Sequence, residues 1–213
     1  MTSVDHYDKK YFDWQQSIGK FGGIANRIKF EDLIKKNQKV LDFGCGGGYL
    51  LDSFENIEKF GVEINEEARK IAIKNKIKTY ESSFDLPSNF FDLIISNNAL
   101  EHVDNPIIEL KELYRSLKIG GKISLVVPCD NITYKFKKND INFHLYSYSP
   151  MNLGNILTAA GFEVISSTPF IHKWPPFYNT FKKFLSWKSF HFLCKIYGRL
   201  DNRWWQTKAV AKK

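Results

Sequence analysis

The amino-acid sequence predicts an α/β fold in which a mostly parallel sheet is covered by helices on both faces. The first observation is the segment VLDFGCGGGYLL, residues 40–51, where an apolar run closes on Asp42 and then opens into glycines. The second is the alternation of strand and helix patterns that follows this segment up to residue 167. Repeated units of this kind are typical of parallel sheets, because each crossover between parallel strands is covered by a helix.

The N-terminal segment, residues 1–38, is predicted to be a helical cap in front of a domain that spans residues 39–213. Apolar residues recur with helical spacing over residues 5–36, and the pair Gly22–Gly23 predicts a break in the helix. Three aromatic residues of the cap either cover a bound ligand or pack against the sheet: Tyr7, Tyr11 and Trp14.

The central elements follow from hydrophobic periodicity and from the residues that start and stop helices. Apolar runs between turn residues predict strands over residues 40–43, 59–64, 77–80, 90–97, 122–127 and 162–167. Helical spacing predicts helices over residues 49–54, from Asn65 through Ala72, from Pro106 to the Gly120–Gly121 pair, and over residues 150–160. Asn65 and Pro106 are residue types favoured at helix starts.

Residues 170–203 break the alternation and form a basic, aromatic insert before the last strand. Their apolar residues do not form one stripe, which predicts two helices with a bend near residues 186–189. The final ten residues, WWQTKAVAKK, alternate as an edge strand does. Residues 171–213 hold ten Lys or Arg and one acid, so their charge is +9, which leaves −1 of the total +8 for residues 1–170.

Composition excludes several classes of protein. No apolar run approaches the roughly 20 residues of a membrane span, and the N-terminal MTSVDHYDKK has no apolar signal region. The cysteines lack CxxC spacing, which excludes a disulfide framework and a structural zinc site: Cys45, Cys129 and Cys194. We therefore expect a cytoplasmic protein with reduced thiols.

The spacing of the glycines distinguishes between kinds of nucleotide-binding turn. A dinucleotide fingerprint that starts at Gly44 would need a third glycine where Tyr49 stands, and a P-loop would need a lysine in the turn. The pattern present is DxGxGxG, from Asp42 to Gly48, and Glu63 follows at the end of the next predicted strand. A carboxylate there can accept two hydrogen bonds from a ribose diol. The alternative is a tight turn beside a solvated Glu63.

Four segments together resemble the successive motifs of class I S-adenosylmethionine-dependent methyltransferases: VLDFGCGGGYLL, GVEIN, FDLIISNNALEHVDNP and LKIGGKISLVVP. They are most similar to the broad small-molecule group that carries an EHVxxP segment, and the match runs from about residue 40 to residue 167. The resemblance implies a Rossmann-like three-layer sandwich with a seven-stranded, mostly parallel sheet whose last strand is antiparallel. It also implies S-adenosyl-L-methionine as the cofactor and S-adenosyl-L-homocysteine as its product.

The same resemblance assigns residues to the methionine and ribose parts of the cofactor. It implies that the backbone of Gly44, Cys45 and Gly46 packs on the methionine half and that Asp42 organises the turn. Glu63 would then hold the ribose hydroxyls.

The remaining cofactor positions concern the adenine and the sulfonium. Ile64 would flank the adenine, and Asn97 would border the sulfonium end. The family often has an Asp that faces the adenine amine, and Ser83 and Phe84 take its place here.

Two histidines near predicted strand ends are the candidate catalytic residues, His102 in LEHVDNP and His144 in NFHLYSYSP. The sulfonium is an activated methyl donor, so a base is needed only for an acceptor that must lose a proton. Histidine titrates near neutral pH, which suits this role. We prefer His144, because in similar enzymes the Glu–His pair of the EHV segment often closes the pocket. Some relatives bind a metal through an ExxEH segment, but Asn98 occupies its first position, so we expect no metal.

We therefore expect methyl transfer to oxygen, in preference to nitrogen, of a small-molecule, sugar or lipid-linked acceptor. The segment SPMNLGNILTAAGFEV resembles small methyltransferases of polysaccharide and lipid modification. The insert at residues 170–203 either contacts an anionic membrane, binds a phosphorylated sugar or nucleic acid, or covers the domain and offers a homodimer face. A nucleic-acid partner is not expected, because residues 1–170 are near neutral. Two alternatives stay open: a catalytically degenerate subunit that binds the cofactor as a partner protein, and an RNA-directed methyltransferase.

Overall fold

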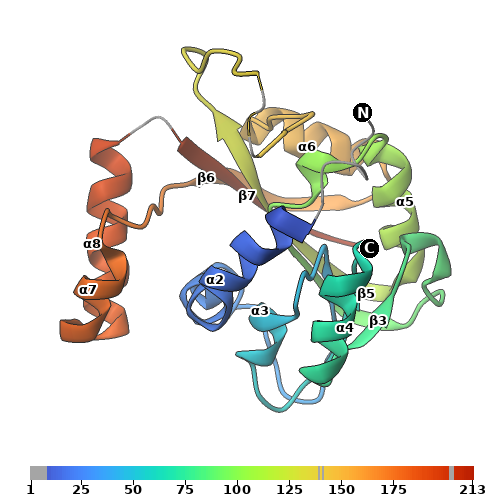
Figure 1. Ribbon diagram of the computed structural model, residues 1–213. Coiled ribbons are helices and arrows are strands. Elements are labelled where there is room, and N and C mark those ends of the chain that lie inside the picture. The colour runs from blue at the N-terminus through green and yellow to red at the C-terminus, as the bar shows by residue number, and fades with distance from the viewer. Residues whose placement is uncertain (1–8, 139, 141, 202–203) are drawn as a thin grey trace.

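The computed structural model describes residues 9–138, 140, 142–201 and 204–213, with the side chains of residues 9–17 and 204 outside that description. One sheet lies between two groups of helices, so the chain forms three layers (Figure 1).

Seven strands form this sheet in the order β3-β2-β1-β4-β5-β7-β6. Neighbouring strands from β3 to β5 are parallel, whereas β7 is antiparallel to both β5 and β6. The predicted Rossmann-like sheet with an antiparallel last strand is thus confirmed. The bounds are β1 Lys39–Phe43, β2 Glu58–Val62, β3 Lys78–Tyr80, β4 Phe91–Asn97, β5 Leu117–Asp130, β6 Glu163–Phe170 and β7 Trp204–Lys212.

Alternate residues of the central strands point into two separate cores, one on each face of the sheet. Ile94 of β4 belongs to the core under α5 and α6, whereas Leu93 and Ile95 belong to the core under α3 and α4. The α-helices are α2 Lys9–Asn26, α3 Tyr49–Asp52, α4 Glu66–Lys74, α5 Pro106–Ser116, α6 Pro150–Ala159, α7 Tyr178–Phe184 and α8 Trp187–Leu200. Three short 3-10 helices join them: η1 Arg27–Lys29, η2 Ser83–Asp85 and η3 Leu100–His102.

The sequence pattern predicts that the pair Gly120–Gly121 ends helix α5, and this prediction is wrong. Helix α5 ends at Ser116, and the pair lies inside β5. Gly120 N donates to Lys213 O at 3.1 Å, and Lys213 N donates to Gly121 O at 3.0 Å. The pair therefore serves strand pairing with the C-terminal segment.

The predicted break at Gly22–Gly23 is also wrong, because the non-helical backbone of α2 lies at Gly19, with φ +22°. Gly22 and Gly23 are both helical, and Gly23 allows α2 to approach α3 closely. A Cβ atom at Gly23 would lie 2.2 Å from the carbonyl oxygen of Tyr49. Helix α2 ends at Asn26, so the predicted helical spacing up to residue 36 continues only as η1 and turns.

The last strand is not an edge strand, contrary to the prediction from its alternation. Strand β7 pairs along its length with β5 on one side and with β6 on the other, and β6 is the edge. The buried positions of β7 include small side chains at Thr207, Ala209 and Ala211, which fit between the two helical layers. Alternation therefore identified a strand correctly and placed it wrongly within the sheet.

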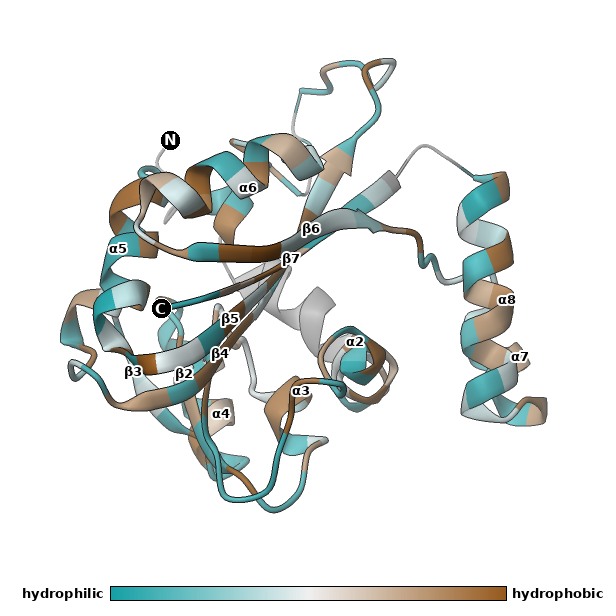
Figure 2. Ribbon diagram, turned by 180° about the vertical axis from the view of Figure 1, so that it is seen from behind, coloured by the Kyte–Doolittle hydropathy of each residue, from teal (hydrophilic) through white to brown (hydrophobic). Residues whose placement is uncertain are grey.

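The basic insert forms two helices, α7 and α8, and the predicted bend falls between Phe184 and Trp187. Phe21 of α2 packs against aromatic rings from this part of the chain, with ring centroids 4.9 to 5.9 Å away: Trp174, Tyr178, Trp187 and Phe190. Both views place α7 and α8 beside α2, on the side of the molecule away from α5 (Figures 1 and 2). Within the described part of the chain, no helix has the length and hydropathy needed to cross a membrane.

Candidate functional site

The glycine turn follows β1 and is tied by its backbone to the end of β2. Gly44 N and Cys45 N both donate to Val62 O, at 2.9 and 3.0 Å. A Cβ atom at Gly44 would lie 2.3 Å from the Cβ of Ala99, so a side chain has no room there. Three glycines have φ in the left-handed region, which glycine adopts without strain: Gly44 at +76°, Gly46 at +52° and Gly48 at +76°. The turn therefore presents bare backbone at the carboxyl end of β1.

Glu63 follows β2, and its carboxylate joins the glycine turn to the start of α4. Its Oε2 accepts from Gly46 N at 2.8 Å, and its Oε1 accepts from Asn65 N at 2.9 Å. Burial raises the pKa of Glu63, while the two backbone donors and Arg69 act in the opposite direction. Each carboxylate oxygen has two lone pairs, so Glu63 can accept further hydrogen bonds from a diol.

Two buried side chains lie at the base of the turn, Asp42 and Cys45. Asp42 is 3% exposed, and its Oδ1 accepts no hydrogen bond from the residues that the structure describes. Burial raises the pKa of Asp42 well above its usual range, and Glu63 adds to this effect. Burial likewise raises the pKa of the Cys45 thiol, which leaves it protonated and unreactive at neutral pH. The buried acceptor on Asp42 suits a ligand that brings a donor.

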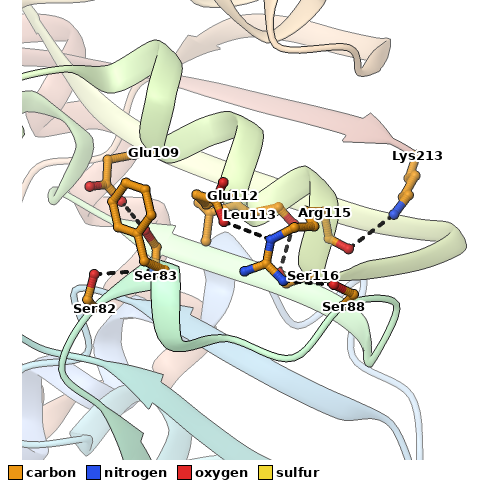
Figure 3. A network of polar contacts seen from close by, with 10 residues as sticks. Ser82, Ser83, Ser88, Glu109, Glu112, Leu113, Arg115, Ser116 and Lys213 are labelled. Carbon is orange, nitrogen blue, oxygen red and sulfur yellow. Dashed lines mark hydrogen bonds and ion pairs between the residues drawn. The ribbon is translucent and has the colours of Figure 1, made fainter.

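The residues predicted beside the adenine lie in two places, Ile64 after β2 and both Ser83 and Phe84 in η2. Ile64 and Phe84 are 51% and 58% exposed, so both offer apolar surface to a ligand. Ser83 is buried, and its hydroxyl donates to Glu109 of α5. Figure 3 shows this contact within a network that ties residues 82–88 to α5. Ser83 thus anchors its loop, and its adenine contact stays a prediction.

A cavity of about 270 Å³ opens at the carboxyl ends of β1 and β4. Its walls come from α2, the glycine turn, the segment after β4 and the loop before α6. No Lys or Arg is found among the described residues that line it. Four of the predicted site residues do not line it: Glu63, Ile64, Ser83 and Phe84. The other seven do: Asp42, Gly44, Cys45, Gly46, Asn97, His102 and His144.

Asn97, at the end of β4, accepts a hydrogen bond from a buried lysine. Lys29 Nζ donates to Asn97 Oδ1 at 2.7 Å, and Lys29 is 4% exposed. Burial lowers the pKa of Lys29 to about 7, partly opposed by the nearby Glu101. Glu101 is fully buried, and this burial raises its pKa to about 8, although His144 and Lys29 favour the ionised form. Neither carboxylate oxygen of Glu101 has a hydrogen-bond partner among the described residues.

His102 and His144 come from η3 and from the loop before α6, and the backbone of Glu101 brings them together. Glu101 O accepts from the backbone N–H groups of residues 145 and 146, at 2.9 and 3.2 Å. The two imidazole rings lie 5.3 Å apart between their centroids. His144 Nδ1 lies 3.7 Å from Asp130 Oδ2, and His102 Nε2 lies 3.7 Å from Glu101 Oε1.

The surroundings of His144 favour its protonated form. Burial alone lowers the pKa of His144, but the carboxylates of Asp130, Glu101 and Asp140 outweigh burial and raise the pKa above 6.5. Since Asp130 faces Nδ1, the other ring nitrogen, Nε2, remains for a ligand. A carboxylate in this position orients an imidazole and makes it a stronger base.

Three side chains of the cavity could together hold a cation. One ligand atom each from Glu101, His102 and His144 lies within 4.8 Å of the others. Asn98 uses its Oδ1 to accept from Gln206 Nε2 at 2.7 Å, so it faces β7. Mg²⁺ has about six ligands, so a Mg²⁺ ion bound to these three side chains would take its other ligands from water or substrate. That the site works without a metal stays a prediction.

Sequence reasoning missed Lys29 and Asp130. Lys29 lies in a stretch with helical spacing, where a lysine is expected to be exposed to solvent. No sequence pattern therefore indicates that it is buried beside the site. Asp130 carried a usable signal, because it is an acid at the carboxyl end of a strand, as Glu63 is. The predicted strand ended at Val127, three residues too early. Tyr7 lies outside the described residues, as do the side chains of Tyr11 and Trp14.

Comparison with known proteins points to one family. A family profile described as "Methyltransferase domain" matches residues 19–167, more than half of the chain. An uncharacterised protein of Methanocaldococcus jannaschii is 34% identical over 184 residues, which cover 81% of this chain and 87% of that protein. Phosphoethanolamine N-methyltransferase 3 of Arabidopsis thaliana is 27% identical over 167 residues, or 68% of this chain. The chain spans only 33% of the length of that plant enzyme.

The fold has solved neighbours as well. The crystal structure of a SAM-dependent methyltransferase from Archaeoglobus fulgidus matches with a TM-score of 0.68 and 22% sequence identity. The match covers 97% of this chain and 100% of that chain. The likeness supports the arrangement of sheet and helices found here.

The glycine turn yields a prediction about stability. The change Gly44→Ala adds a methyl group at positive φ and against Ala99, whereas Gly120→Ala adds one at φ +78° where no atom lies within 4 Å. We expect Gly120→Ala to cost about 1–2 kcal/mol of unfolding free energy from backbone strain. Gly44→Ala should cost about 1–3 kcal/mol more, because Ala99 must move. Urea denaturation without ligand measures both, and equal losses would show that the close contact is unimportant.

Proposed function

Because the chain belongs to the class I S-adenosylmethionine-dependent methyltransferases, we propose that it transfers the cofactor's methyl group to an oxygen atom of a small-molecule, sugar or lipid-linked acceptor. The observation that carries this proposal is the pairing of His144 with Asp130 beside the cavity that also contains the glycine turn. The glycine turn that would bind the cofactor and the histidine that would act as the base then line the same cavity.

The residues around the turn fit the cofactor. The bare backbone at Gly44 and Gly46 leaves space for the methionine half, and the buried Oδ1 of Asp42 suits its ammonium group. Glu63 would accept hydrogen bonds from the ribose diol while it holds the turn. The exposed side chains of Ile64 and Phe84 would cover the adenine. When bound, S-adenosylmethionine supplies a methyl group on a sulfonium, which is activated for in-line displacement.

The residues on the acceptor side would move one proton. Asp130 faces Nδ1 of His144 at 3.7 Å, so Nε2 would take the proton of an acceptor hydroxyl as the oxygen attacks the methyl carbon. Glu101 positions the loop that carries His144 through its backbone carbonyl. His102 lies beside His144 and helps to close the cavity.

The charges of the cavity favour a neutral hydroxyl acceptor. The described lining residues include no Lys or Arg, so a phosphate group would find only a protonated His144 as a counter-charge, and that form cannot act as the base. Burial raises the pKa of Glu101 to about 8, so this carboxyl carries little charge at neutral pH. The acceptor named for the plant relative, phosphoethanolamine, carries both a phosphate and an ammonium group and fits this cavity less well.

Cofactor binding provides the first test. We expect S-adenosylmethionine to bind the purified protein and Glu63→Ala to weaken binding at least about tenfold, because the turn and the ribose both lose an acceptor. Glu67→Ala, an exposed carboxylate two residues into α4, serves as the matched control and should leave affinity unchanged. Isothermal calorimetry measures both. Failure to bind at millimolar cofactor would contradict both a methyltransferase and a cofactor-binding partner subunit.

Turnover provides the second test. We expect His144→Ala to slow release of S-adenosylhomocysteine by about 100-fold or more, while cofactor affinity stays within about threefold, because a general base acts on the chemical step alone. His191→Ala, on α8 outside the cavity, is the control. The acceptor panel contains phenols, sugar alcohols and phosphoethanolamine.

Each outcome of the turnover assay separates the alternatives. Methylation of phosphoethanolamine alone would contradict the oxygen acceptor. Activity lost in EDTA and restored by Mg²⁺ would place a cation on Glu101, His102 and His144 instead of a free base. Cofactor binding without turnover on this panel or on RNA would favour the degenerate subunit.

The pH dependence follows from the raised pKa of His144. Only the neutral imidazole can take a proton, so the rate should rise with pH through a midpoint above 6.5. Asp130→Asn removes a carboxylate that holds this pKa up, so the midpoint should move to lower pH. A pH profile of kcat/KM measures the shift. An unchanged midpoint would mean that another group, such as Glu101, is the titrating base.

A further inference from the structure

The outer face of α7 and α8 is a second distinctive surface of the molecule. Helix α8 buries Phe190, Cys194 and Gly198 toward the protein. Phe192, Ile196 and Leu200 lie on its opposite side, and their spacing of four residues places them in one stripe. They are 66%, 40% and 80% exposed. Phe181 and Phe184 of α7 are exposed as well. A helix that only covers its domain in water would present a polar outer face.

A row of cations runs beside this apolar stripe. Lys188, Lys195 and Arg199 are spaced by seven and four residues, which places them along one flank of α8. Within the described ranges of the chain, none of the three has an ion-pair partner. The one acid of residues 171–213, Asp201, is already paired with Lys173 at 2.8 Å. The flank therefore carries uncompensated positive charge.

A groove of about 750 Å³ separates α8 from the end of α2 and η1. Among the described residues that line it are three cations, Arg27 from η1 and Lys188 and Lys195 from α8, and one acid, Glu31. Its apolar walls include Trp187 and Phe192. Positive charge above aromatic and aliphatic surface is the combination that a phosphate-bearing headgroup with its acyl chain would match.

We infer that the α7–α8 surface, formed by the apolar stripe, the cationic flank of α8 and this groove, binds the anionic lipids of a membrane surface. In this arrangement the apolar stripe enters the boundary between the lipid headgroups and the acyl chains, and the cations bind the headgroup phosphates. Helix α2 lies between the groove and the cavity, since Ile24 lines the first and Ile18 and Gly22 line the second. Delivery of a lipid-linked acceptor along this route rests on the proposed function, whereas the membrane contact does not.

Cosedimentation of the full chain with vesicles tests the inference. We expect binding to phosphatidylcholine vesicles that contain phosphatidylserine, little binding to pure phosphatidylcholine, and loss at high salt, because screening weakens the attraction. The variant Lys188→Gln/Lys195→Gln/Arg199→Gln should weaken binding about 100-fold, at about fivefold per cation. The control Lys74→Gln/Lys111→Gln/Lys122→Gln removes the same charge from exposed positions on α4, α5 and β5 and should bind like the unchanged protein.

Cofactor calorimetry of both variants confirms that they are folded, since neither changes a residue of the cavity. No vesicle binding at low salt, or binding that the α8 variant retains and the control loses, overturns the inference. So does a dimer in sedimentation that the α8 variant breaks while vesicles stay unbound, because the surface would then join two copies of the chain. Vesicle binding by a protein without methyl transfer would leave the inference standing and remove the proposed function.

Discussion

The site depends on three places where a glycine, by lacking a side chain, lets another segment of the chain pack closely against its backbone. Gly44 at the end of β1 meets Ala99 beyond β4, where a Cβ would come within 2.3 Å. Gly23 brings α2 onto the carbonyl of Tyr49. Gly61 in β2 leaves room for the Sγ of Cys45, which would lie 2.4 Å from a Cβ there. These contacts set how closely α2, the turn and the strand ends converge, and so they set the width of the cavity.

The opposite wall of the cavity is held by polar contacts and not by close packing at glycines. There the chain is held by buried and half-buried polar groups: the Glu101 carbonyl, the Lys29–Asn97 hydrogen bond and the His144–Asp130 pair. Burying such groups costs stability unless they are well partnered. Burial also lowers the pKa of Lys29 and raises the pKa of Glu101, so both move toward neutrality. Perturbed pKa values of this kind cluster where chemistry occurs. The cavity thus joins a wall shaped by close backbone contacts to a wall of polar groups, which is the combination that the proposed methyl transfer needs.

The sequence predicted the sheet, and seven of its eleven candidate site residues line one cavity, because glycine spacing and polar residues at strand ends are local patterns. It could not show that Lys29 is buried, since burial depends on how η1 meets β4. It misread Gly22–Gly23 as a break, because a glycine pair looks the same whether it bends a helix or admits a neighbour. It also misplaced β7, because alternation reports one half-buried strand and says nothing of its partners on either side. Local signals predict elements, and contacts between distant segments decide the rest.

The position of β7 has a consequence for how the sheet is assembled. Strand β7 follows β6 in the chain but lies between β5 and β6, pairing Val126 with Lys208 on one side and Thr168 with Lys208 on the other. Strand β6 therefore cannot join the sheet before β7 does, and during synthesis both β5 and β6 leave the ribosome with an unpaired edge. Pairings between such distant segments are slow to form. The growing chain is most open to mispairing with other chains in the interval before the last strand arrives.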